Sequence, residues 1–206
     1  MRSQKAEEIL DVAEAMARSG GYGGFSFRDL AKAVGIKSAS VHYHFPTKED
    51  LGVAMTRRYN QRFIDGLGDP RGEGTVDEKI ARYINAFRTS MIEDRLMCLC
   101  GLFGAEVTSL PGDVAVETKV FFEKNRDWLM AVLAADVRFA DDDARERAAL
   151  TLIAKLQGAM IMARTMIDVG VFETILEDPL GRVGIPAAVP ENPLSGSRKA
   201  DPSDGI

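Results

Sequence analysis

The chain has 206 residues, with 26 Lys and Arg against 31 Asp and Glu, and its formal net charge is −5. This length is sufficient for one or two domains with a buried core. A content of 46% hydrophobic and 28% charged residues is ordinary for a folded chain and argues against disordered, collagenous and membrane proteins. The longest wholly apolar run, residues 128–135, is far shorter than the roughly 20 residues that span a bilayer.

The N-terminal sequence and the cysteine content both bear on the cellular compartment. The first ten residues, MRSQKAEEIL, contain no apolar segment typical of a secretory signal. The two cysteines, Cys98 and Cys100, are too few for a disulfide framework. We therefore expect a cytoplasmic protein in a reducing environment.

Positive charge is concentrated near the N-terminus. Residues 26–62 hold seven Lys and Arg against three Asp and Glu, although the chain as a whole is acidic. A local positive surface of this kind can bind a polyanion. On charge alone, a solvated face without a partner is an equally good interpretation.

The first segment is predicted to be an amphipathic helix. Within residues 3–18, the apolar side chains at positions 9, 10, 13, 16 and 17 fall on one stripe. The glycine-rich run at 20–24 ends this helix, since glycine adopts the left-handed backbone of helix C-termini. A phosphate-binding loop is disfavoured because the glycines follow a helix and match no phosphate-loop spacing.

The most informative segment is FSFRDLAKAVGIKSASVHYHFPTKEDL, residues 25–51. Ser26, with an acidic residue three positions on, is typical of a helix N-terminus. Gly35 ends this short helix, and a second short helix is predicted over 38–44, with Pro46 after it. Thr47 then begins a third helix. Two short helices joined by a tight glycine-containing turn form a helix-turn-helix.

The remainder is predicted to consist of longer helices near 76–91, 96–110, 113–135 and 142–169. Apolar residues of the last helix cover more than one face, which favours packing both within the subunit and against a second subunit. Together with the helix at 113–135 it is our candidate for a four-helix bundle in a dimer, and an intramolecular core is the alternative. From Pro179 onward there are five prolines in 28 residues, which is typical of a loosely ordered tail.

Residues 25–51 resemble the DNA-binding segment of TetR-type (TetR/AcrR) transcriptional regulators, and the likeness extends over about residues 5–55. The resemblance implies an all-α fold with an N-terminal helix-turn-helix DNA-binding domain and a C-terminal helical ligand-binding and dimerisation domain. We expect the first domain to cover residues 1–47, the second 48–177, and a Pro/Gly-rich tail 178–206.

The second short helix is predicted to enter the major groove of DNA. Lys can pair with guanine there, Ser can read either base of a pair, and Ala can contact a thymine methyl group. Lys48, Ser26 and Arg28 lie at helix starts, where they can contact phosphates, and the resemblance implies phosphate contacts for Tyr43 and His44. The predicted DNA-binding residues are Ser26, Arg28, Lys37, Ser38, Ala39, Ser40, His42, Tyr43, His44 and Lys48. Two depart from the common family pattern, because His42 stands where many members have Tyr and Lys37 where a capping Ser is common.

The resemblance further implies a homodimeric repressor that binds a palindromic operator in double-stranded DNA and is released by a small-molecule inducer. The abundance of Met and aromatic side chains favours an apolar or aromatic inducer. The candidate pocket residues are Phe87, Met91, Cys98, Phe103, Phe121, Trp128 and Met160. The alternative for most of these side chains is an ordinary hydrophobic core.

Two alternative functions remain. One is a regulator of the same fold that senses electrophiles or oxidants through Cys98 or Cys100, against which stands a buried, inert thiol. The other is a small helical enzyme or a ligand-binding protein without DNA binding. The sequence contains no GxSxG, HExxH, P-loop or CxxC motif, so we predict that the protein is not an enzyme. His42 and His44 diverge on a helix, so we expect no metal and no cofactor.

Overall fold

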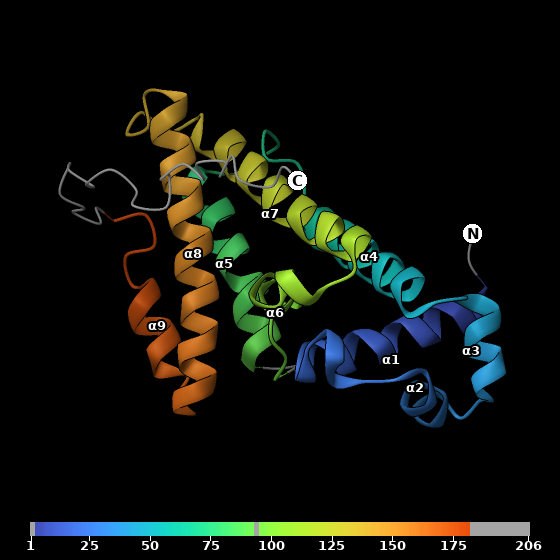
Figure 1. Cartoon of the computed structure of the whole chain (residues 1–206). Helices are drawn as coiled ribbons and strands as arrows, with labels where there is room; N and C mark the ends of the chain where they lie inside the picture. The colour runs from blue at the N-terminus through green and yellow to red at the C-terminus, as the bar shows by residue number, and fades with distance from the viewer. Residues whose placement is uncertain (1–2, 93–94, 182–206) are drawn as a thin grey trace, which may run out of the picture.

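A computed structural model describes residues 3–92 and 95–181, and within these residues it contains helices and no strand (Figure 1). The helices are α1 (Gln4–Gly20), α2 (Phe27–Val34), α3 (Ser38–His44), α4 (Lys48–Leu67), α5 (Val76–Ile92), α6 (Leu99–Ala105), α7 (Gly112–Leu133), α8 (Asp142–Met166) and α9 (Gly170–Leu176). Short 3-10 turns lie at Tyr22–Gly24 and Val107–Ser109. The expected all-helical class is confirmed.

The helices form two groups at opposite ends of the molecule. Figure 1 shows α1, α2 and α3 at one end, α8 and α9 at the other, and α4 running from the first group along α7. Helix α7 is the centre of the larger group, where it packs against α4, α5, α6 and α8. Phe121, Leu129 and Leu133 on α7 are almost wholly buried there. The buried apolar side chains of both groups belong to one hydrophobic core.

A close contact joins the two groups at the start of α4. The threonine at position 47 accepts a hydrogen bond from the backbone N–H of Asp50, and the Asp50 side chain accepts one from Thr47 in return, which fixes where α4 begins. One turn later, a Cβ atom at Gly52 would lie 2.9 Å from both the Tyr22 ring and the Val114 side chain. Gly52 therefore allows the α1–α2 connection, α4 and α7 to meet at one point.

The structure differs from the predicted helices in two places. The helix expected over 96–110 is only α6 with a 3-10 turn, because the chain is not helical before Leu99. The helix expected to reach 169 ends at Met166, where Ile167 adopts a left-handed backbone with φ of 56° and α9 follows. Apolar residues continue through this break, so the sequence pattern hides it. The loosely ordered tail was expected over 178–206, and of it residues 182–206 lie outside the described part.

The described helices can be tested for the length and apolar character that a membrane-spanning segment needs. None of those within residues 3–92 and 95–181 is both long enough and apolar enough to cross a membrane.

Candidate nucleic-acid interface

The helix-turn-helix is fixed by caps at both ends of α2. At its start, Ser26 accepts a hydrogen bond from the Asp29 backbone N–H at 3.2 Å, and Asp29 accepts one from the Ser26 N–H at 3.0 Å. At its end, Gly35 adopts a left-handed backbone with φ of 73°, and the N–H of Ile36 donates to the carbonyl of Ala31 at 2.9 Å. This glycine-capped turn directs the chain sharply into α3.

Helix α3 presents most of its surface to solvent. Val41 and, just after the helix, Phe45 are buried and attach it to the neighbouring helices. In contrast, Tyr43 is 83% exposed. The other predicted contact residues around it are also accessible: Lys37, Ser38, Ala39 and His42 are exposed, and Ser40 and His44 are half-buried. The helix lies at the end of the molecule away from α8 (Figure 1), so its outer face is open to a large ligand.

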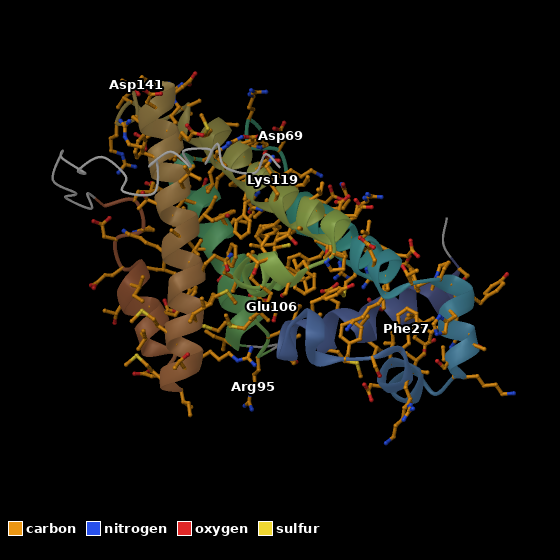
Figure 2. The ribbon with its side chains drawn as sticks, in the orientation of Figure 1. Phe27, Asp69, Arg95, Glu106, Lys119 and Asp141 are labelled. Carbon is orange, nitrogen blue, oxygen red and sulfur yellow. The ribbon has the colours of Figure 1, made fainter. Side chains whose placement is uncertain are left out.

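The His42 side chain is held on both sides. Its Nδ1 atom lies 3.3 Å from the carbonyl oxygen of Pro46. Its ring meets the Phe27 ring edge to face, with 4.7 Å between the ring centres. Phe27 is the first residue of α2 and is labelled in Figure 2. The imidazole is therefore positioned by the turn after α3 and by the start of α2.

Two predicted phosphate-binding side chains have internal partners instead. The Ser26 hydroxyl donates to the Asp29 carboxylate at 2.6 Å, which lowers the pKa of Asp29. The Lys48 ammonium donates to the carbonyl of Phe25 at 2.6 Å and lies over the rings of Tyr22 and Phe25, at 4.8 and 4.5 Å. Partial burial lowers the pKa of Lys48. In this structure both side chains hold α2 and its connections in place, while Arg28 is exposed.

Sequence reasoning missed two side chains that tie the DNA-binding end to the rest of the chain. Glu106, labelled in Figure 2, accepts a hydrogen bond from the backbone N–H of Tyr22 at 2.9 Å. Arg164 of α8 donates to the carbonyl of Ser19, near the end of α1, at 3.1 Å. Both residues are polar within apolar stretches, and that was the available signal. The partners of such residues cannot be read from local spacing, because they lie 84 and 145 positions away in the chain.

A charged cluster joins α1 to α4. Glu14 is 5% exposed, and its carboxylate lies between three guanidinium groups. It is 3.6 Å from Arg18 and 3.4 Å from Arg58, and it also contacts Arg62. Arg18 in turn donates to the carbonyl of Met97 at 2.8 Å. The cluster therefore links α1, α4 and the residues before α6.

The seven predicted pocket residues do not gather around one cavity. Phe87 lines a cavity of about 190 Å³ between α1, α4 and α5, together with Glu14, Arg18 and Tyr59. Met91 lines a second cavity of about 410 Å³ near the ends of α5 and α8. The other five are at most 5% exposed and pack in the core: Cys98, Phe103, Phe121, Trp128 and Met160. A ligand pocket built from all seven therefore stays a prediction.

Comparisons with known proteins place this geometry in a family. Residues 9–55, which include α2, α3 and the start of α4, match the model of the bacterial regulatory proteins of the tetR family. A TetR transcriptional regulator from Legionella pneumophila is 36% identical in sequence, with a TM-score of 0.77, over 87% of this chain and 95% of that one. The chain belongs to the TetR family of bacterial transcriptional regulators.

Two further similar proteins are also transcriptional regulators. A regulator from Agrobacterium tumefaciens is 31% identical, with a TM-score of 0.79, over 85% of this chain and 95% of the other. The negative transcriptional regulator IcaR of a biofilm operon in Staphylococcus epidermidis is 34% identical over 61 residues, which is 30% of this chain and 33% of IcaR. This match spans about a third of IcaR. TetR-family proteins are DNA-binding, non-enzymatic transcription factors, so the predicted absence of enzymatic activity follows from the family.

Proposed function

We propose that this TetR-family regulator is a homodimeric repressor that binds a palindromic operator through α3 and leaves it when a small molecule binds. The observation that carries the proposal is the exposed, polar outer face of α3 on a helix anchored by buried Val41. An exposed recognition helix is the element that a helix-turn-helix inserts into the major groove. Repression is supported by the similarity to IcaR, which is a negative transcriptional regulator.

The side chains divide into two kinds of contact. Lys37, Ser38, Ala39, Ser40 and His42 lie on α3 or just before it and would face base edges. Arg28, Tyr43 and His44 flank this face and would contact phosphates. Ser26 and Lys48 are engaged with Asp29 and Phe25, so we assign them first to holding α2 and its connections. A phosphate contact by either would be made in addition.

Dimerisation would occur through α8. Leu150 and Ile161 on α8 are 49% and 50% exposed, and both are apolar. Between them, a Cβ atom at Gly158 would meet nothing within 4 Å, so the backbone there is open to a close neighbour. The accessible side chains of α7 are mostly charged, although Val116 is 57% exposed. We therefore place most of the interface on α8 and less of it on α7 than the sequence suggested.

The cavity between α1, α4 and α5 is the site that we propose for the inducer. Three aromatic side chains, Tyr59, Phe63 and Phe87, form part of its wall, which suits the predicted aromatic or apolar ligand. Its charged wall belongs to the Glu14 cluster, which ties α1 to α4. A ligand there would shift α1 and the attached reading helix relative to α4. A coupling free energy of about 1–3 kcal/mol between inducer binding and operator binding would change the operator affinity roughly 5- to 150-fold.

The test is to compare two variants on a duplex selected by the wild-type protein, using fluorescence anisotropy. We expect Arg28→Ala to weaken binding to all duplexes alike and to lower the salt dependence, because it removes a phosphate contact. Ser40→Ala should change the preference between duplexes that differ in one base pair. If both variants bind every duplex as the wild type does, α3 is not the reading element.

A further inference from the structure

We propose that His42 selects a base that carries an amino group in the major groove, adenine or cytosine, at one position of each half-site. This inference rests on the proposed placement of α3 in the groove and adds a rule for one base pair. His42 is also one of the positions at which the chain departs from the family pattern, because many members have Tyr there. The rule follows from the hydrogen bond that His42 makes within the protein.

The hydrogen bond to Pro46 fixes which nitrogen of the imidazole carries the proton. Nδ1 of His42 lies 3.3 Å from the Pro46 carbonyl oxygen, and a carbonyl oxygen can only accept. Nδ1 must therefore be the donor. In a neutral imidazole one nitrogen donates and the other accepts, so Nε2 is left as an acceptor.

The side chain that carries this acceptor belongs to an exposed residue of α3. His42 is exposed, and its neighbour Val41 turns inward and is wholly buried. The edge-to-face contact with Phe27 and the bond to Pro46 hold the ring from two sides. Nε2 is the ring nitrogen farther from the backbone, and the two contacts leave the ring little freedom. Little conformational entropy is then lost when it meets DNA.

An acceptor in the major groove distinguishes the bases in a definite way. Adenine presents its N6 amino group there and cytosine its N4 amino group, whereas guanine and thymine present acceptor oxygens. A lone pair on Nε2 therefore favours adenine or cytosine at the contacted position. A tyrosine hydroxyl both donates and accepts, so Tyr at this position would not impose the same choice.

The first experiment measures the tautomer directly. Long-range ¹H–¹⁵N correlation spectra of the imidazole nitrogens, recorded on the full-length protein at pH 8, identify which nitrogen is protonated. We expect the Nδ1–H form for His42. The Nε2–H form would overturn the proposal whatever the protein does with DNA.

The second experiment measures the base preference. Selection of bound duplexes from a random pool should reveal one base pair of each half-site that the wild-type protein specifies and that His42→Ala no longer specifies, while the other preferences are kept. Because every base pair carries one such amino group in the major groove, on its adenine or its cytosine, the decisive test is to remove that group. Replacing that adenine with 2-aminopurine, or that cytosine with 2-pyrimidinone, removes the amino group. Wild-type affinity should then fall about 2- to 12-fold, the range for one neutral hydrogen bond, and the affinity of His42→Ala should not fall.

The control variant is Ser40→Ala, which should keep the preference for the amino group because it changes a different contact on α3. An equal loss in wild type and in His42→Ala would mean that the base analogue acts through the duplex alone, and it would contradict the proposal. Unchanged wild-type affinity after the amino group is removed from that base pair would contradict it too. If no sequence is enriched at all, the proposed function fails together with this inference.

Discussion

Cys98 and Cys100 are only 1% and 0% exposed. This burial argues against the alternative function, in which one of the two thiols senses electrophiles or oxidants. Burial raises the pKa of the Cys100 thiol well above its ordinary value, so the reactive thiolate is disfavoured. Cys100 also lies 3.5 Å from the Asn60 side-chain oxygen, inside the contact between α4 and α6. These surroundings are typical of inert, structural cysteines.

We therefore predict that the folded protein is not alkylated at either cysteine. Iodoacetamide at pH 7.5 should leave both thiols unmodified during a period in which the protein in guanidinium chloride is fully labelled, because an unexposed thiol offers no nucleophile. Mass spectrometry of the intact chain measures this. An adduct on Cys98 or Cys100 in the native protein, accompanied by a change in DNA affinity, would restore the sensing hypothesis.

At the scale of elements, the contact between α1 and α4 depends on one buried carboxylate. Glu14 lies between Arg18, Arg58 and Arg62, and Arg58 also pairs with Glu7 at 3.0 Å. Removing one partner of a buried ion pair leaves uncompensated charge, which is more costly than the pair itself is favourable. The orientation of α1, and with it the reading helix, therefore depends on Glu14.

We predict that Glu14→Ala lowers the free energy of unfolding by about 3–5 kcal/mol, the range for a broken buried ion pair. The matched control is Glu8→Ala on the same helix, whose carboxylate pairs with Lys5 on the surface and is 47% exposed. That change should be within about 1 kcal/mol. Urea unfolding followed by circular dichroism measures both. Equal effects of the two substitutions would show that α1 is not held by this cluster.

Local signals explain which elements the sequence could predict. Ser26, Gly35 and Thr47 act through neighbours three to five positions away, so α2, α3 and the start of α4 were predictable from residue type and spacing. The end of α8 was not, because Ile167 adopts its left-handed backbone within an apolar stretch that continues the helical pattern. The short extent of α6 was missed for the same reason.

The residues of the candidate interface were predictable in type but not in geometry. The exposure of α3 follows from the burial of Val41 and Phe45, which are apolar residues within a mostly polar segment. The internal partner of Lys48 was not predictable, because a side chain near a helix start can turn either toward a phosphate or toward its own chain. The partner of Ser26, in contrast, follows from the capping spacing to Asp29. Cavities were least predictable, since Trp128 and Phe121 look the same in sequence whether they line a pocket or fill a core.

At the scale of the whole molecule, the exposed apolar stripe of α8 predicts a dimer. Ala154 lies on this stripe between Leu150 and Ile161 and is exposed. A long charged side chain there would be buried without a partner in the interface. We predict that Ala154→Arg makes the protein monomeric at micromolar concentration and leaves its helical content unchanged.

The control for this substitution is Ala81→Arg, which makes the same change at an exposed alanine of α5 and should leave the dimer intact. Val116→Arg on α7 tests whether α7 contributes, as the sequence suggested. Analytical ultracentrifugation distinguishes the species. A wild-type protein that sediments only as a monomer, or an Ala154→Arg protein that remains dimeric, would remove α8 as the interface.

Two copies of α3 are proposed to read one duplex together, and selection of bound duplexes from a random pool measures whether they do. We predict an enriched inverted repeat whose half-sites lie about one helical turn apart or a multiple of it. Its affinity should fall steeply with salt, with a log–log slope near −0.9 for each phosphate contacted. Enrichment of no sequence, or of a single unrepeated site bound with little salt dependence, would contradict it.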